Sequence, residues 1–280
     1  MEINTDYFCN RWQLTNIHTL NMSDCTGNYV ATAFSKHYET NVILKIATNP
    51  TVFVQEQKAL IYFNGNGCVK LLDYDLEKSG LLLELIEPGT QLKILFFSDQ
   101  TQSNIIAADI IKKLHKHPIS PTVAAEFKTI NQWLALLENF PSDNIPKSLL
   151  TQANTLAQQL LNTQSDLYLL HGDLHQENIL QKDNSWIAID PQGVVGELAY
   201  EIGTLVRNPA PELLAQKNPQ EIMIRSINQL SSIFAIDRQR LIDWSFVQAV
   251  LAVCWTEQDN DAVQRKYYIE VAQLLLSPKK

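Results

Sequence analysis

Apolar and polar positions alternate through the first part of the chain, which predicts β-strands there. The runs YVATAF and NVILKIA, at 29–34 and 41–47, flank a polar turn and are typical of an antiparallel hairpin. Two further strand candidates follow, VKLLDYD at 69–75 and GLLLELI at 80–86. Between the two pairs, Asn49 precedes a proline and opens a stretch with helical spacing, so one helix is expected among the strands.

The pattern changes to helical spacing after the segment EPGT at 87–90, where proline and glycine are expected to stop the preceding strand. A short strand, DLYLL, then leads into the polar stretch HGDLHQENIL at 171–180, and a second hairpin ends at Asp190. The helices expected in this part of the chain cover 101–116, 123–140, 146–163, 197–206, 219–234, 237–255 and 261–276.

These patterns together predict an α+β protein of two lobes. Residues 1–86 form a small antiparallel β-sheet lobe with one key helix, 87–90 form the hinge, and 91–280 form a larger, mainly helical lobe that carries the polar stretch. A chain of 280 residues is long for one compact domain, which agrees with two lobes in one functional unit.

Composition narrows the classes of partner. The formal net charge of -8 disfavours nucleic acid and anionic membranes, and it suits a cationic small molecule better. The amino terminus lacks an apolar signal core, and the longest apolar run, 246–255, is too short to span a bilayer. The four cysteines show no paired spacing, so a cytoplasmic protein with reduced thiols is expected.

The two histidines of HGDLHQENIL raise the alternative of a metal site. A two-histidine, one-carboxylate centre beginning at HGD needs a second histidine far downstream, but none follows His175. A zinc pair of His171 and His175 on one helix would place Gly172 inside that helix. Neither arrangement is favoured.

Phosphoryl transfer gives each polar residue of this region a task. Asp173 and Asn178 have the five-residue spacing of a kinase catalytic loop, in which the carboxylate accepts the hydroxyl proton of the substrate and the amide oxygen binds Mg²⁺. Asp190, at the end of the returning hairpin, is placed to supply a second metal ligand. The alternative is that Asp173 and Asn178 only cap turns.

Lys45 and Glu56 provide an independent test from the first lobe. Strand alternation places Lys45 on the face opposite Val42 and Leu44, and helical spacing places Glu56 on an apolar face. A carboxylate there is costly without a partner, so a Lys45–Glu56 pair is expected, as in kinases where this lysine holds the phosphates. The alternative is that Lys45 and Glu56 do not pair, and that each side chain extends its charged end into water.

The turn that would cover the phosphates is poor in glycine. The stretch MSDCTG at 22–27 has one glycine in place of a glycine-rich motif. Its backbone amides with the hydroxyls of Ser23 or Thr26 are the candidates for phosphate contacts.

Five stretches of the sequence carry a family resemblance: EQKAL, VKLLDYD, LLLELIEPGTQL, HGDLHQENIL and IAIDPQGVVGELAYEIGTLVRNP. They resemble the aminoglycoside phosphotransferases, in particular the streptomycin 6-kinase and hydroxyurea kinase branch. The resemblance runs from about Lys45 to Trp255 and implies a protein-kinase-like fold with ATP and Mg²⁺ as cosubstrates. By this resemblance Asp173 is the catalytic base, and Asn178 and Asp190 are the metal ligands. Lys45 is the lysine that binds the phosphates, and Glu56 is its partner.

The same resemblance implies further site residues. The backbone of Glu84, Leu85, Ile86 and Glu87 would receive adenine, as a hinge does. His171 and Glu201 would steady the catalytic loop, although Glu201 also fits a solvated helix face. The residues expected to bind substrate are Glu197, Glu257, Asp259 and Asp261. For the last three, the alternative is that they only lie in an exposed turn between helices.

Three hypotheses for function follow. The leading one is a kinase that phosphorylates a hydroxyl of an aminoglycoside-like antibiotic, with streptomycin the best single candidate, acting as a monomer or weak dimer. The second changes the acceptor to a metabolite such as a sugar or an amino alcohol, or to a hydroxyurea-like compound. The third, raised by the glycine-poor turn, is a nucleotide-binding pseudokinase that serves as a scaffold.

Overall fold

The computed structural model divides into two compact units. The first contains Met1–Thr90 and Leu180–Gln192, and the second contains Gln91–Ile179 and Gly193–Lys280. The residues that the structure describes are 5–20, 28–138, 140–141, 143–164 and 166–276.

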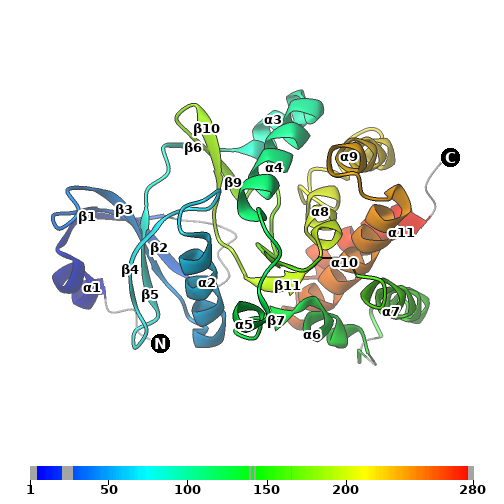
Figure 1. Ribbon diagram of the computed structural model, residues 1–280, viewed down its shortest axis with the longest axis horizontal. Helices are drawn as coiled ribbons and strands as arrows, with labels where there is room; N and C mark the ends of the chain where they lie inside the picture. Colours follow the sequence, from blue (N-terminus) through cyan, green and yellow to red (C-terminus); the bar gives the residue numbers. More distant parts are fainter. Residues whose placement is uncertain (1–4, 21–27, 139, 142, 165, 277–280) are drawn as a thin grey trace. The chain divides into compact units, whose positions relative to one another are not determined.

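The first unit is built on a five-stranded antiparallel sheet of strand order β1-β2-β3-β5-β4 (Figure 1). The predicted hairpin forms its centre, because Ala31 of β2 faces Leu44 of β3 in the register. The elements are α1 (Thr5–Trp12), β1 (Leu14–Thr19), β2 (Tyr29–Ser35), β3 (Thr40–Ile46), α2 (Pro50–Phe63), β4 (Leu71–Asp75) and β5 (Gly80–Glu84).

The two faces of β3 have different partners. Val42 and Leu44 are fully buried and belong to a core cluster with Phe8 and Trp12 of α1. Lys45 points to the opposite face, where its ammonium group meets Glu56 of α2. Strand alternation therefore separates the apolar core from the charged face, as expected.

A second, three-stranded sheet of order β10-β9-β6 brings a later segment of the chain into the first unit. It contains β6 (Pro88–Gln91), β9 (Ile179–Lys182) and β10 (Ser185–Ala188). The amide of Ala188 donates to the carbonyl of Gly67, and the amide of Val69 donates to the carbonyl of Ala188, which ties this hairpin to the first unit. The sequence division placed the hairpin in the helical lobe, because backbone pairing across such a distance leaves no local pattern.

The strand β5 ends at Glu84, ahead of the segment 87–90, as expected. The segment itself was not expected to form a strand, but Pro88 begins β6. Proline is tolerated as the first residue of a strand, where no ladder donor is needed, and Gly89 takes a positive φ of 72°.

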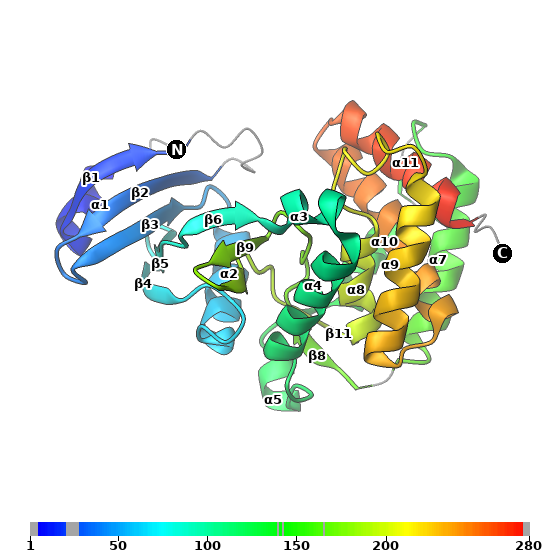
Figure 2. The same cartoon turned by 90° about the horizontal axis from the view of Figure 1, so that it is seen from above.

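The second unit is organised around α10 (Arg238–Gln258), which is buried along most of its length and packs against four other helices, α7, α8, α9 and α11 (Figure 2). A short sheet of order β7-β11-β8 lies in the same unit. The other elements are α3 (Leu92–Ser98), α4 (Gln100–Leu114), α5 (Pro121–Ala124), β7 (Lys128–Thr129), α6 (Ile130–Leu134), η1 (Ala135–Leu137), α7 (Lys147–Leu161), β8 (Tyr168–Leu170), β11 (Val194–Gly196), α8 (Leu198–Val206), α9 (Pro219–Phe234) and α11 (Ala262–Leu276).

One predicted helix, 123–140, is wrong. Lys128 and Thr129 form β7 and pair in parallel with β11, which ends α5 and starts a new helix. The Thr129 side chain accepts from the amide of Gln132, whose side chain accepts from the amide of Thr129, so a capping box opens α6.

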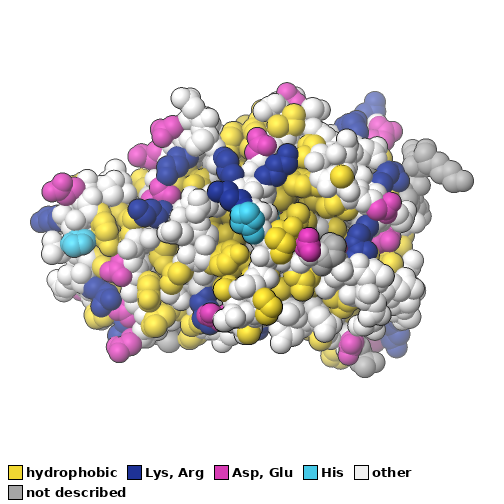
Figure 3. Space-filling model, in the orientation of Figure 1, with side chains coloured by type: hydrophobic (Ala, Val, Ile, Leu, Met, Phe, Trp, Pro, Cys, Tyr) yellow, Lys and Arg dark blue, Asp and Glu magenta, His cyan; other side chains and the backbone are white. Residues whose placement is uncertain are grey.

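An antiparallel sheet unit and a mainly helical unit confirm the predicted α+β class. Among the described residues, no helix combines the length and apolar character needed to cross a membrane. On the face shown in Figure 3, acidic and basic side chains are interspersed with hydrophobic and uncharged ones.

Candidate active site

A buried ammonium group forms the charged centre of the first unit. Lys45 Nζ lies 2.7 Å from Glu56 Oε1 and 3.1 Å from Asp190 Oδ1. Burial opposes the charge of Lys45, but the carboxylates of Asp190 and Glu56 outweigh it and raise the pKa of Lys45. The structure thus brings together three residues that the sequence singled out, and it holds Lys45 positively charged.

Asp190 reaches this cluster from the end of the β9–β10 hairpin. The residue takes a left-handed backbone conformation with φ of 59°, which aspartate tolerates better than most residues. Its side chain remains 38% exposed, while the side chain of Lys45 is 8% exposed. One carboxylate oxygen therefore faces Lys45, and the group retains access to solvent and to a ligand.

In the second unit, Glu201 and His171 hold the backbone of the loop 171–178. Both carboxylate oxygens of Glu201 lie 3.3 Å from the amide nitrogen of Gly172, and Glu201 is fully buried. His171 is also fully buried, and its Nδ1 accepts from the amide of Asp173 at 3.3 Å. His115 Nε2 lies 3.6 Å from Glu201 Oε2. These contacts fix the turn immediately before Asp173.

The Asp173 carboxylate has a donor or a cation on each oxygen. Asn178 Nδ2 donates to the main-chain oxygen of Asp173 at 2.9 Å and lies 3.5 Å from Oδ2. His175 Nε2 is 3.6 Å from Oδ2, and Arg207 Nη2 is 3.7 Å from Oδ1. Burial would favour the protonated acid, but His175 and Arg207 together lower the pKa of Asp173. The group is therefore a carboxylate at neutral pH.

A chain of alternating charges extends from Asp173 through His175. The Nδ1 atom of His175 lies 3.2 Å from Glu177 Oε2, and Lys93 Nζ lies 2.7 Å from Glu177 and 2.9 Å from Glu212. Burial works against the charged imidazole, but Asp173 and Glu177 raise the pKa of His175 to about 9.

Sequence reasoning gave no role to His175, Arg207 or Lys93. For His175 the signal was present, since it lies two positions after Asp173. Arg207 and Lys93 are distant in sequence from the loop, and no local pattern marks them.

In the expected hinge, the Glu84 side chain is engaged within the first unit. Its Oε1 accepts from the amide of Lys70 at 2.8 Å, and its Oε2 pairs with Lys182. Ile86 is buried, and the carbonyl of Glu87 accepts from the amide of Asp183 at 3.0 Å. Ser23 and Thr26 lie outside the described residues.

Two of the acids expected to bind substrate, Glu257 and Asp261, have partners within the second unit. Glu257 pairs with Arg265 and accepts from Asn144, and Asp261 caps the start of α11 by accepting from the amides of Val263 and Gln264. Asp259 is exposed at the end of α10. Their assignment to substrate stays a prediction.

Glu197 is the most enclosed of the acids expected to bind substrate. It is 2% exposed and accepts from the Arg240 guanidinium and from Trp244 Nε1. Those contacts join α10 to the residue that precedes α8, and they give Glu197 a clear structural task.

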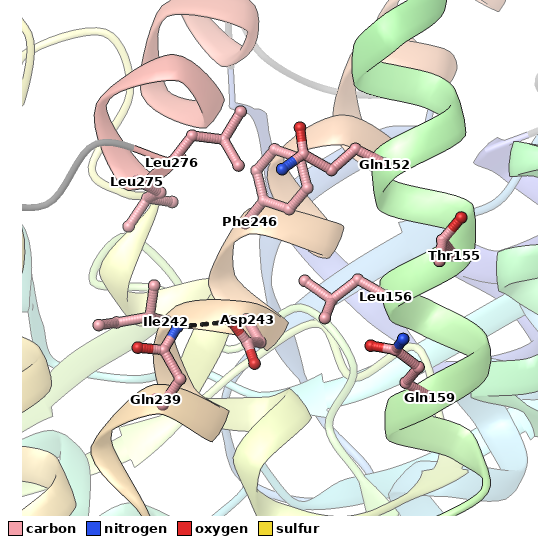
Figure 4. Close-up of a pocket in the computed structure, with 10 residues that line it drawn as sticks. All are labelled: Gln152, Thr155, Leu156, Gln159, Gln239, Ile242, Asp243, Phe246, Leu275 and Leu276. Carbon is pink, nitrogen blue, oxygen red and sulfur yellow. Dashed lines mark hydrogen bonds between the residues drawn. The ribbon is translucent and has the colours of Figure 1, made fainter.

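A separate cavity of about 580 Å³ lies in the second unit where α7, α10 and α11 meet (Figure 4). Gln239 donates to Asp243 within it. Its lining mixes amides and a carboxylate with apolar groups and comprises Gln152, Thr155, Leu156, Gln159, Gln239, Ile242, Asp243, Phe246, Leu275 and Leu276. The residues of the loop 171–178 do not line it.

The charge of His175 can be checked in the protein free of nucleotide and metal. We expect its imidazole to titrate at about pH 9, followed by NMR of the ring carbon-bound protons. Glu177→Gln should lower this midpoint, because it removes one of the two carboxylates that favour the imidazolium. The exposed Glu221→Gln should leave it unchanged. A wild-type midpoint near the ordinary value of about 6.5 would contradict the arrangement.

Glu197→Gln tests the structural task of that residue. The change leaves Arg240 without a carboxylate partner, so the free energy of unfolding should fall by about 1.5–3 kcal/mol, measured by urea denaturation. The exposed Glu270→Gln in α11 should change it by less than about 0.5 kcal/mol. Unchanged stability in Glu197→Gln would return Glu197 to the acids available for a ligand.

Comparisons with known proteins show the family and the fold of this chain. A family model described as "Aminoglycoside/hydroxyurea antibiotic resistance kinase" matches residues 11–260. The streptomycin 6-kinase of Streptomyces griseus is 26% identical over 223 residues, which cover 77% of this chain and 71% of that protein. The hydroxyurea phosphotransferase of Kitasatospora aureofaciens is 26% identical over 245 residues, 85% of this chain and 68% of that protein.

Among solved structures, the fold is shared with the aminoglycoside phosphotransferase APH(4)-Ia in a ternary complex with ADP and hygromycin B. The TM-score is 0.72 and the match covers 97% of each chain, at 10% sequence identity, so this likeness concerns the fold alone. The family match covers most of the chain and includes the loop of Asp173 and Asn178, together with Lys45, Glu56 and Asp190. The chain therefore belongs to the aminoglycoside/hydroxyurea antibiotic resistance kinases, and it is a phosphotransferase with a protein-kinase-like fold that acts on a hydroxyl group.

Proposed function

We propose that this kinase transfers the γ-phosphoryl group of ATP, with Mg²⁺, to a hydroxyl of streptomycin or a closely similar antibiotic. The support for the acceptor is the similarity to two streptomycin 6-kinases, at 26% and 24% identity. ATP is supported by the chemistry of the two charged clusters and by kinases of the same fold that were solved with ADP or AMP-PNP. A reaction that consumes ATP suits a cytoplasmic protein.

The observation that carries the proposal is the cluster of Lys45 with Glu56 and Asp190. A buried lysine whose charge is maintained by two carboxylates is suited to the α- and β-phosphates, because phosphate oxygens can replace the Asp190 contact while Glu56 keeps the ammonium group in position. The backbone of Glu84 to Glu87 is proposed to receive adenine, through peptide groups that do not depend on side-chain identity. Ser23 and Thr26 are retained as candidates for phosphate contacts.

Asn178 of the second unit and Asp190 of the first unit remain the proposed magnesium ligands, because each carries an oxygen of the kind that Mg²⁺ prefers. Asn178 donates through Nδ2 to Asp173, which turns its amide oxygen away from that residue and leaves it available as a ligand. Among the described residues, no group of three His, Cys, Asp or Glu side chains forms a complete protein cage for a metal. Mg²⁺ commonly uses one or two protein oxygens with water and phosphate oxygens, so this donor set is appropriate. When bound, the ion would offset the negative charge on the phosphates.

Asp173 is proposed to orient the acceptor hydroxyl and to receive its proton. The carboxylate is charged at neutral pH and 38% exposed, so it can accept a hydrogen bond from a hydroxyl group. Its lowered pKa makes it a weak base, which suits a loose transition state in which the proton leaves late. His171 and Glu201 hold the loop backbone next to Asp173.

The acceptor site is less defined than the phosphate end. The net charge of -8 favours a cationic small molecule, and Asp259 is the exposed member of the proposed acid set. Glu257, Asp261 and Glu197 would have to give up existing partners to bind a ligand. Streptomycin therefore rests on the comparisons more than on these acids.

Asp173→Ala tests the catalytic assignment. Turnover of streptomycin should fall by about 10²- to 10⁴-fold, because the general base and its orienting contact are lost. Nucleotide affinity, measured by titration calorimetry with AMP-PNP and Mg²⁺, should stay near the wild-type value. Asp166→Ala removes an exposed carboxylate from the same unit and should retain full activity. Full activity in Asp173→Ala would end the assignment.

An acceptor panel tests the substrate. We expect ATP consumption to be stimulated most by streptomycin among streptomycin, hydroxyurea, hygromycin B, simple sugars and amino alcohols. Preference for hydroxyurea would favour the other branch of the family, and preference for a sugar or an amino alcohol would favour a metabolite kinase. An absence of Mg²⁺-dependent ATP consumption with every acceptor and with water would favour the pseudokinase hypothesis.

A further inference from the structure

Arg207 is a buried cation beside the catalytic loop to which no role has yet been given. It follows the last residue of α8, and its side chain is 6% exposed. Its Nη2 atom lies 3.7 Å from Asp173 Oδ1. Arg207 therefore approaches Oδ1 of Asp173, whereas His175 and Asn178 approach Oδ2.

Helix α11 holds Arg207 in this position through two tyrosines. The Arg207 Nη1 atom donates to the Tyr268 hydroxyl at 3.1 Å, and the centre of the guanidinium lies 5.3 Å from the centroid of the Tyr268 ring. The Tyr267 hydroxyl donates to the main-chain oxygen of Arg207 at 2.9 Å. Both the backbone and the head group of Arg207 are thus fixed by α11.

The contacts of Arg207 with the fold do not account for its charge. Tyr268 is a neutral partner, and the Nε atom of Arg207 is buried without a hydrogen-bond partner among the described residues. Burying a guanidinium is costly unless a carboxylate compensates for it. Within the described chain, the carboxylate in salt-bridge range of Arg207 is that of Asp173.

The geometry points to Arg207 as a positioning residue that, anchored by Tyr268, holds the Asp173 carboxylate in the orientation needed to receive the acceptor hydroxyl. This inference rests on the proposed role of Asp173. A planar, permanently charged group suits the task, because it restricts rotation of the carboxylate from the Oδ1 side while His175 and Asn178 restrict it from the Oδ2 side. A rival interpretation gives Arg207 only a packing role, at the junction of α8 and α11.

The kinetic test uses Arg207→Ala and Arg207→Lys with streptomycin and ATP. We expect kcat to fall by about 100-fold in Arg207→Ala, since a displacement of a catalytic group of about 1 Å can cost that much. The KM for ATP should change by less than about twofold. Guanidinium chloride at low millimolar concentration should restore part of kcat in Arg207→Ala by filling the vacated space, and Arg207→Lys should retain more activity than Arg207→Ala.

Two further variants separate positioning from packing. Tyr268→Phe keeps the ring and removes the hydroxyl that anchors Nη1, so it should lower kcat less than Arg207→Ala does. Arg225→Ala removes an exposed arginine from α9, and it should keep wild-type kcat and show no response to guanidinium. Wild-type kcat in a folded Arg207→Ala protein, or a loss of thermal stability with kcat unchanged, would overturn the proposal in favour of packing.

Crystal structures of the wild type and Arg207→Lys provide a readout that needs no acceptor. We expect one Asp173 side-chain conformation in the wild type and a rotated or multiply occupied one in the variant. An unchanged Asp173 conformation would overturn the positioning role, even if streptomycin proved not to be the acceptor. If the wild type fails to phosphorylate streptomycin while the Asp173 conformation changes as expected, the acceptor is wrong and the positioning role stands.

Discussion

The charged state of one buried lysine is the constraint on which the first unit depends. Lys45 lies on a strand whose other face forms the apolar core, and its ammonium group can remain charged there because Glu56 and Asp190 supply two carboxylates. This requirement explains why α2 presents an acid on a mostly apolar face. It also explains why the β9–β10 hairpin, encoded more than 130 residues after Lys45, is tied by backbone hydrogen bonds to the first unit.

In the second unit, buried charges are likewise stabilised by neighbours of opposite sign, here along a series of five side chains. Arg207, Asp173, His175, Glu177 and Lys93 alternate in sign from one contact to the next. Each member offsets the cost of burying its neighbour, so the removal of one charge changes the protonation or the orientation of the next. A carboxylate embedded in such a series is held charged and directed, which suits the positioning of a hydroxyl group better than strong basicity would.

The family match indicates the reaction of this kinase, but it does not indicate which acceptor the kinase binds. Relatives that match the same family include kinases of streptomycin and a phosphotransferase of hydroxyurea, which differ greatly as molecules. The acids expected to recognise a cationic acceptor are largely engaged in holding helices together, as the Glu197–Arg240 and Glu257–Arg265 pairs show. Acceptor choice therefore depends on surfaces that a family motif does not describe.

The sequence by itself determined whatever depends on short-range spacing. Strand alternation predicted the faces of β3, and the cap at Asn49 predicted the start of α2. The spacing of Asp173 and Asn178 singled out one polar loop, in which these two side chains lie 3.5 Å apart. Tertiary structure alone decided that Lys128 and Thr129 pair with β11 and interrupt a predicted helix. It also decided that Arg207 meets Asp173, since that contact joins groups 34 positions apart through the packing of α8 against the loop 171–178. The physical reason is that local sequence sets backbone preference and burial pattern, whereas the partner of a buried charge is chosen by which distant elements pack together.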